Sequence, residues 1–198
     1  MPRTTSALAV LLATAVLLVA AGDGAANRIS SSNEQFRIVY SPLRFRARGG
    51  TEISCNATLE GTLINGGVLN KIFGGQYGFI IRADRSSCAI RFLTETLSWP
   101  IILTGFVGML PNIAGINTRI EIFRFAWTGF FSDCLYESTS TSRQPLNWFL
   151  NAAGLLTSVE MSPAWIPSKT LGCEEIEVRG TGTATIRGGA TQLTMTLI

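Results

Sequence analysis

Carboxylates are the side chains best able to do chemistry in this chain, because the sequence contains no histidine. Without imidazole the chain lacks the commonest general base, the usual serine and cysteine triads, and the ligand of most zinc and copper sites. Two acids at a suitable separation are nevertheless enough for glycoside hydrolysis. The candidates are Glu95, Glu121, Asp133, Glu137 and Glu160. Because most carboxylates are simply solvated at the surface, the sequence predicts no catalytic residue and no enzyme, with a two-carboxylate hydrolase as an alternative.

The other polar motifs also favour structural roles. Three acids after Cys173 could contact calcium, but they lack the Asp-rich spacing of a calcium loop, so neither a metal site nor a cofactor is predicted; they are Glu174, Glu175 and Glu177. Ser-Lys catalysis would need Lys71 or Lys169, and a solvated lysine is expected in the polar turn that holds Lys169. Asn56 begins an N-x-[ST] triplet on the polar side of a predicted strand, and whether it is glycosylated stays open.

Aromatic and apolar side chains offer a possible binding surface. Tryptophan rings can stack against carbohydrate; a core position is expected for Trp127, whereas Trp165 lies between two prolines and is the best candidate for an exposed ring. Residues 98–116 are apolar but interrupted by prolines, which predicts a strand from Trp99 to Val107 paired with part of 117–128. The connection over 108–116 would then leave apolar residues partly exposed as a contact site, or fold back and bury them. The possible binding surface is Trp99, Met109, Leu110, Ile113 and Trp165.

Residues 1–26 have the features of a secretory signal peptide. Arg3 provides a positive start, 7–21 form a short apolar run, and small residues follow where a signal peptidase would cut. The run is too short for a membrane span. We therefore expect a secreted, extracellular protein with one β-rich domain over 27–198 and no transmembrane segment in the mature chain. The net charge of +3 is too small to indicate nucleic acid as a partner.

Strand patterns dominate the rest of the chain. Residues 51–64 alternate between apolar and polar side chains, which predicts a half-buried strand with Cys55 facing the core. For Phe45 and Ile53 to share the core face, the preceding hairpin needs a three-residue loop over 48–50 with glycine at positive φ. A second hairpin is expected to join 77–82 to 88–93. Residues 145–156 fit either a short helix or a strand.

Many short strands with glycine-rich turns predict an all-β domain. An antiparallel β-sandwich is the preferred architecture, and a closed β-barrel, able to hold an apolar ligand, is the alternative. Four cysteines in an exported chain predict two disulfides. The expected pairs are Cys88 with Cys134, which would clamp the apolar middle of the chain, and Cys55 with Cys173.

Several segments together resemble a known kind of protein. These are ISCNATLEGTL after a first strand, a strand led by Cys88, the LSWPI segment, and a late Cys173 followed by VRGTGTATI and a final strand. The chain thus resembles small secreted β-rich proteins of actinobacteria whose function is unassigned. The resemblance implies a secreted β-domain with internal disulfides and carries over no catalytic residue. We expect an extracellular binding or surface component whose ligand or partner the sequence does not identify.

Overall fold

A computed structural model of the chain describes residues 28–109, 112–128 and 133–198. The predicted signal peptide therefore lies outside the described residues. The strands in chain order are β1 (Arg28–Ser31), β2 (Gln35–Ala47), β3 (Glu52–Leu63), β4 (Val68–Asn70), β5 (Gln76–Ser86), β6 (Ile90–Phe92), β7 (Trp99–Met109), β8 (Asn112–Ile120), β9 (Arg124–Thr128), β10 (Asp133–Glu137), β11 (Gln144–Leu150), β12 (Leu156–Ile166), β13 (Ile176–Ile186) and β14 (Met195–Leu197). Short 3-10 turns at Asn65–Gly67 and Thr94–Thr96 interrupt them.

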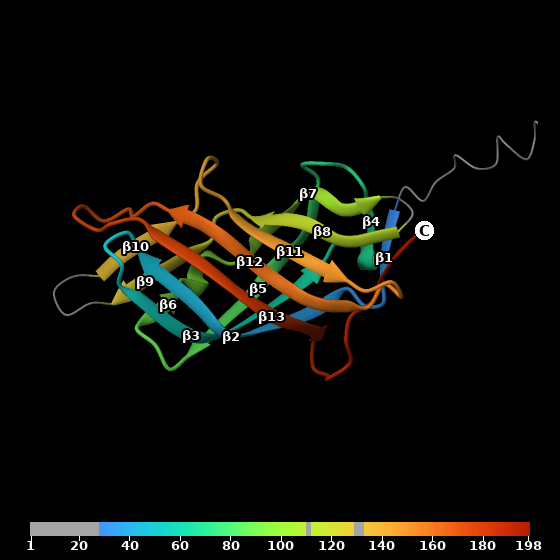
Figure 1. Ribbon diagram of the computed structural model, residues 1–198, viewed down its shortest axis with the longest axis horizontal. Helices are drawn as coiled ribbons and strands as arrows, with labels where there is room; N and C mark the ends of the chain where they lie inside the picture. The colour runs from blue at the N-terminus through green and yellow to red at the C-terminus, as the bar shows by residue number, and fades with distance from the viewer. Residues whose placement is uncertain (1–27, 110–111, 129–132) are drawn as a thin grey trace, which may run out of the picture.

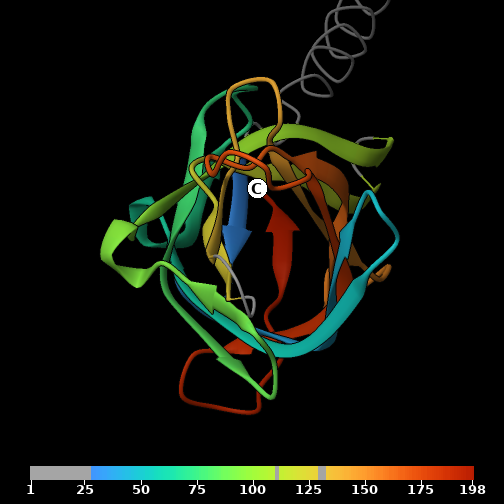
Figure 2. The ribbon, with the colours of Figure 1, turned by 90° about the vertical axis from the view of Figure 1, so that its left-hand side faces the viewer.

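The long strands form a closed antiparallel barrel in the order β11-β12-β13-β2-β3-β5-β7-β8, and the ring closes where β8 pairs with β11. Viewed along the long axis, the strands surround the interior on all sides (Figure 2). The all-β class and the two disulfides are confirmed. Of the two architectures considered, the closed barrel is formed and the preferred sandwich is not, because the β8–β11 pairing removes the open edges that a sandwich would keep.

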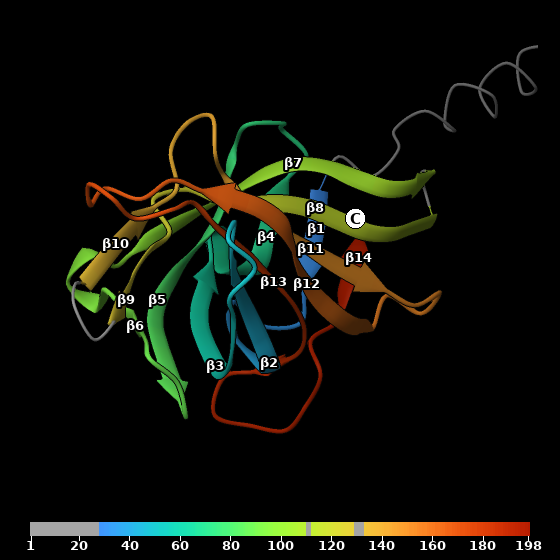
Figure 3. The ribbon, with the colours of Figure 1, turned by 60° about the vertical axis from the view of Figure 1, so that its left-hand side comes forward.

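Two three-stranded sheets lie at opposite ends of the barrel (Figures 1 and 3). The first, β14-β1-β4, contains the first and last described strands, and we call it the terminal cap. The second, β10-β9-β6, we call the disulfide cap. The two caps together with the barrel account for every strand in the described part of the chain.

Aromatic side chains pack the barrel interior. Toward one side, Trp148 makes an edge-to-face contact with Phe36 at a centroid distance of 5.2 Å. Elsewhere in the same core, Trp99 and Phe123 meet edge to face at 5.2 Å. Trp99 is fully buried, so its expected place on a binding surface is wrong: it begins a strand whose inward side chains alternate into the core.

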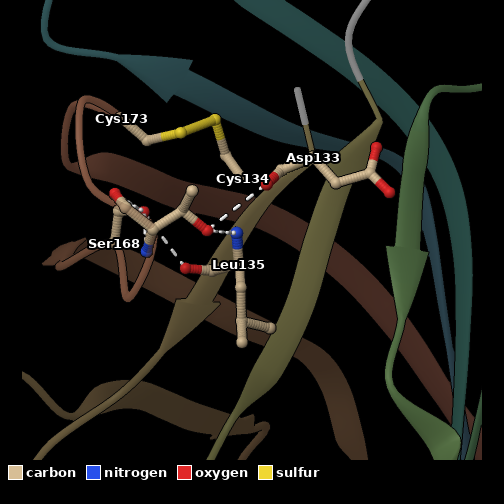
Figure 4. The surroundings of a disulfide bond; sticks show 6 residues. Asp133, Cys134, Leu135, Ser168 and Cys173 are labelled. Carbon is tan, nitrogen blue, oxygen red and sulfur yellow. Dashed lines mark hydrogen bonds between the residues drawn. A yellow bond between two sulfur atoms is a disulfide. The ribbon is translucent and has the colours of Figure 1, made fainter. Parts of the chain in front are cut away.

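Both disulfides attach the disulfide cap to its surroundings, and the expected pairing is wrong. Cys55 on β3 bonds to Cys88 just before β6, while Cys134 on β10 bonds to Cys173 in the loop before β13. Figure 4 shows the second bridge beside Ser168. The prediction assumed that a Cys88–Cys134 bridge clamps the apolar middle of the chain, but β6 and β10 lie on opposite sides of β9, which separates the two cysteines.

The first hairpin has the predicted register. Phe45 pairs with Ile53 and Leu43 with Cys55, and Gly50 takes a φ of 92° in the loop over 48–50. The second predicted hairpin is wrong: β5 pairs with β3 and β7, whereas β6 leaves the barrel wall to pair with β9. Residues 144–150 resolve as strand β11, followed by a turn into β12.

The apolar stretch forms a longer hairpin than predicted. β7 pairs with residues 117–120 as expected, but β8 already starts at Asn112, so there is no long turn over 108–116. Ile113 is partly buried against the core. The side chain of Met109 and the whole of Leu110 lie outside the described residues.

Candidate binding site on the barrel wall

Three neighbouring strands break their register at the same level of the wall. The shifts fall between Met161 and Ala164 on β12, between Arg179 and Gly182 on β13, and between Tyr40 and Leu43 on β2. Two of the three irregular stretches contain a Ser-Pro pair, Ser41-Pro42 and Ser162-Pro163. Proline has no N–H to donate to a ladder, so within a sheet it is confined to edges and bulges.

The aligned bulges open a pocket of about 450 Å³ on the outer wall. We call it the bulge pocket; its lining residues are Ser41, Pro42, Arg44, Glu160, Met161, Pro163, Arg179, Gly180 and Thr181. A second hollow of about 290 Å³ shares Ser41 and extends across β3 and β5. Between them the Ser41 hydroxyl donates to Asn56 Oδ1 at 2.9 Å. Bulges commonly re-aim side chains next to functional sites.

Close strand contact at the bulge depends on glycine. A Cβ on Gly180 would lie 3.0 Å from the Pro42 carbonyl oxygen, and one on Gly182 would lie 2.7 Å from the Val39 carbonyl oxygen. Both neighbours are backbone atoms, which cannot swing aside. The two glycines therefore let β13 approach β2 where the register shifts.

Ion pairs hold the pocket's arginines in place. Glu52 on β3 contacts Arg44 at 3.5 Å and Arg179 at 3.2 Å. On the opposite side, Glu160 accepts a hydrogen bond from the Ser162 hydroxyl at 3.0 Å, and Asn147 Nδ2 donates to that hydroxyl at 2.8 Å. The pocket thus presents cationic donors and an anionic acceptor that already have partners within the protein.

Buried polar groups support the bulge from inside the barrel. Gln144 is fully buried and donates from Nε2 to the Ser162 carbonyl at 2.9 Å. A bulge leaves such a carbonyl without its ladder partner, and a buried unpaired carbonyl is costly. Tyr40 lies on the inner side of the bulged part of β2, where burial, and secondarily the charge of Glu160, raises the pKa of its hydroxyl.

Trp165 continues the outer face of β12 beyond Pro163. It is 36% exposed, as the flanking prolines predicted, and the Arg48 guanidinium lies 5.3 Å from its ring centroid. Arg48 is itself paired with Glu175 at 2.7 Å. Trp127 is partly buried against the core, where a core role was expected.

In the described part of the chain, two of the five candidate acids share one hollow. Glu121 and Glu137 both line a hollow of about 280 Å³. Each is paired with an arginine: Arg119 contacts Glu121 at 3.2 Å, and Arg124 contacts Glu137 at 2.8 Å. Both carboxylates are therefore already engaged in ion pairs with arginine.

The remaining predicted acids lie apart from that hollow along the chain. Glu95 is in the 3-10 turn before β7, Asp133 begins β10, and Glu160 belongs to the bulge pocket. The acidic cluster after Cys173 contacts the first hairpin: Glu174 accepts from the Gly49 N–H at 2.6 Å. Within the described ranges, no group of three or more histidine, cysteine, aspartate or glutamate side chains is placed to hold a metal ion.

Sequence reasoning missed Arg44, Arg179 and Ser41 as site residues. The two Ser-Pro pairs within strand patterns were the available signal, because proline inside a strand marks a bulge. Nothing in the sequence indicated that the register shifts of β2, β13 and β12 would meet at one level of the wall, since that depends on registers between distant segments.

The chain matches no protein-family model, no curated protein and no solved structure. In the described part of the chain, no helix is long and apolar enough to cross a membrane.

Proposed function

We propose that the protein is a secreted, non-catalytic binding component that holds a saccharide of an extracellular or cell-surface polymer in the bulge pocket. The observation that carries the proposal is that the register shifts of three adjacent strand pairs, β12–β13, β13–β2 and β2–β3, meet at one pocket. The two disulfides support an oxidising compartment outside the cytosol, in agreement with the expected signal peptide.

The chemistry of the pocket suits a polyhydroxylated ligand. Sugar hydroxyls both donate and accept hydrogen bonds, and the pocket offers donors from Arg44 and Arg179 and an acceptor from Glu160. With Glu52 included, two cations face two anions, so the charges balance and a neutral ligand fits better than a strongly charged one. The exposed Trp165 ring nearby offers a surface for the apolar face of a sugar.

The outer wall is favoured over the barrel interior. An apolar-ligand barrel needs open space inside, whereas the described interior is occupied by fully buried aromatic rings such as Trp148 and Phe36. The ion pairs of Glu121 and Glu137 likewise favour binding over hydrolysis.

Affinity electrophoresis tests the proposal, with the exported chain run through gels that contain dextran, mannan or galactan. We expect at least one polysaccharide to retard the protein. Thr181→Trp should remove the retardation, because Thr181 is exposed at the pocket and the indole would fill it without breaking an ion pair. Thr185→Trp, on the outer face of the same strand outside the pocket, is the matched control and should migrate as the unmodified chain does.

Trp165→Ala should weaken the apparent affinity about tenfold, equivalent to about 1.4 kcal/mol. If none of the three polysaccharides retards the unmodified protein, or if both tryptophan substitutions have the same effect, the proposal fails.

A further inference from the structure

Two large apolar side chains are exposed side by side on the connection between β4 and β5. Ile72 is 63% exposed and Phe73 is 66% exposed. Adjacent exposed residues of this size usually mark a contact surface. We call residues 71–75 the apolar loop.

The barrel wall holds the apolar loop in position. The Gly74 N–H donates to the Leu103 carbonyl at 2.8 Å, and the Leu103 N–H donates to the Gly75 carbonyl at 3.0 Å. The Phe73 ring also lies 5.9 Å from the partly buried ring of Phe106 on β7. The loop is thus joined to β7 like a short additional strand, and it presents Ile72 and Phe73 outward.

The surrounding end of the barrel carries basic residues and few acids. Arg28 on β1 pairs with Asn70, the residue before Lys71, so two cationic side chains lie on neighbouring segments beside the apolar pair. No acid occurs in segments 64–76, 103–109, 112–118, 147–159 or 191–198; these include the apolar loop and the parts of β7, β8, β11, β12 and β14 near the terminal cap (Figures 1 and 3). Glu34 lies on the connection between β1 and β2, and Glu160 directly follows the segment 147–159.

The same end is where the chain would leave the membrane during export. β1 begins at Arg28, just after the expected signal peptide, and it is the middle strand of the terminal cap. Removal of residues 1–26 would also add an α-ammonium group beside Arg28. On the expected route of export, a lipid surface would lie close to this end when the signal peptide is removed.

We propose that the terminal-cap end of the barrel docks on an anionic lipid surface. Ile72 and Phe73 enter the boundary between headgroups and acyl chains, and Arg28 and Lys71 face the anionic headgroups. Two side chains are too few for a stable protein–protein interface. They suit shallow insertion into a bilayer, where burial of apolar area and attraction to anionic lipid act together.

Vesicle flotation tests this docking. The exported chain, with its N-terminus read by mass spectrometry, is mixed with vesicles of equal parts phosphatidylglycerol and phosphatidylcholine, and separately with pure phosphatidylcholine. We expect it to float with the anionic vesicles and to float less with the neutral ones. Salt at 0.5 M should release part of the bound protein, because it shortens the electrostatic screening length to on the order of a few ångströms.

The decisive variant is Ile72→Asp with Phe73→Asp, for which we expect at least about a tenfold loss of the floated fraction. Leu171→Asp is the matched control, because Leu171 is 101% exposed and lies in the loop beside the disulfide cap, at the other end of the barrel; it should float like the unmodified chain. Unchanged guanidinium midpoints for both variants show that the fold is retained.

Two results would overturn the proposal. One is absence of flotation, or flotation that the Ile72 and Phe73 substitutions leave unchanged. The other is a dimer in lipid-free sedimentation that those substitutions dissociate, which would assign the apolar loop to a contact between two copies of the chain.

Discussion

Removal of the Cys134–Cys173 bridge tests how the disulfide cap contributes to stability. The bridge closes a loop with a sequence separation of 39, for which chain entropy in the unfolded state predicts a loss of about 4 kcal/mol when both cysteines become alanine. The folded cap should persist, because the Leu135 N–H donates to the Thr170 hydroxyl at 3.0 Å and the Ser168 hydroxyl donates to the Leu135 carbonyl at 3.2 Å (Figure 4). The cost therefore arises mainly in the unfolded chain.

The other bridge is the natural comparison, because it fastens the same cap. Cys55–Cys88 has a sequence separation of 33, and the same model predicts an entropy term within about 0.2 kcal/mol of the first. Cys55 is buried, whereas Cys134 is only partly buried. Loss of the Cys55 sulfur therefore leaves a small cavity that adds about 1 kcal/mol, and the Cys55→Ala, Cys88→Ala variant should be the less stable of the two.

Guanidinium unfolding followed by tryptophan fluorescence measures both losses, since Trp99 and Trp148 are fully buried and become hydrated when the barrel opens. A loss of less than about 1 kcal/mol in the Cys134, Cys173 variant, with a loss of about 4 kcal/mol in the other, would contradict this expectation. In that case the disulfide cap unfolds in a separate step before the barrel, and the Cys134–Cys173 bridge does not contribute to the stability of the barrel.

Four further outcomes are expected. Trp148→Ala should cost about 3–5 kcal/mol of unfolding free energy, measured by denaturant titration, because the fully buried indole fills the barrel. Glu60→Gln should cost about 1–3 kcal/mol, because this carboxylate is 8% exposed and contacts three arginines; a loss below 0.5 kcal/mol would contradict a structural role. Burial raises the pKa of Tyr40 and Tyr77, so these tyrosines ionise at lower pH in the unfolded chain than in the folded one. The free energy of unfolding should therefore stay constant below pH 10 and fall above it by about 1.4 kcal/mol per pH unit for each tyrosine. Guanidinium midpoints that do not change between pH 9 and 11 would contradict this pH dependence. Glu121→Gln should leave the fold intact, and the variant and the unmodified chain should not differ in an assay for hydrolysis of glycoside substrates. A hydrolytic activity that the unmodified chain has and this variant lacks would contradict the non-catalytic proposal.

Local registers were predictable because neighbouring residues determine them. In the first hairpin, the requirement that Phe45 and Ile53 share one face left a single loop length, and Gly50 could adopt the positive φ that this loop needs. The strand containing Cys55 was predictable for the same reason, since alternation along one segment defines its buried side.

Pairings between distant segments were not predictable. Closure of the barrel depends on β8 meeting β11, for example Ile120 beside Gln144, and no local pattern encodes that choice. The disulfide pairing depends on β6 leaving the wall to join β9, which the sequence between them does not reveal. The candidate site was not predictable for the same reason, because the register between β2 and β13 places Arg44 beside Arg179.

The position of β1 has a consequence for the order in which the chain can fold. β1 lies between β4 and β14, and the backbone groups of Arg28 and Ile198 bond to each other in both directions, at 3.2 and 3.0 Å. β2 likewise lies between β3 and β13. β1 and β2 thus each need one partner from late in the described chain, β14 and β13, and these two pairings cannot form until that part has been synthesised. On the proposed route of export, such a chain would cross a translocation pore unfolded, and its barrel would close on the far side, where its cysteines would be oxidised.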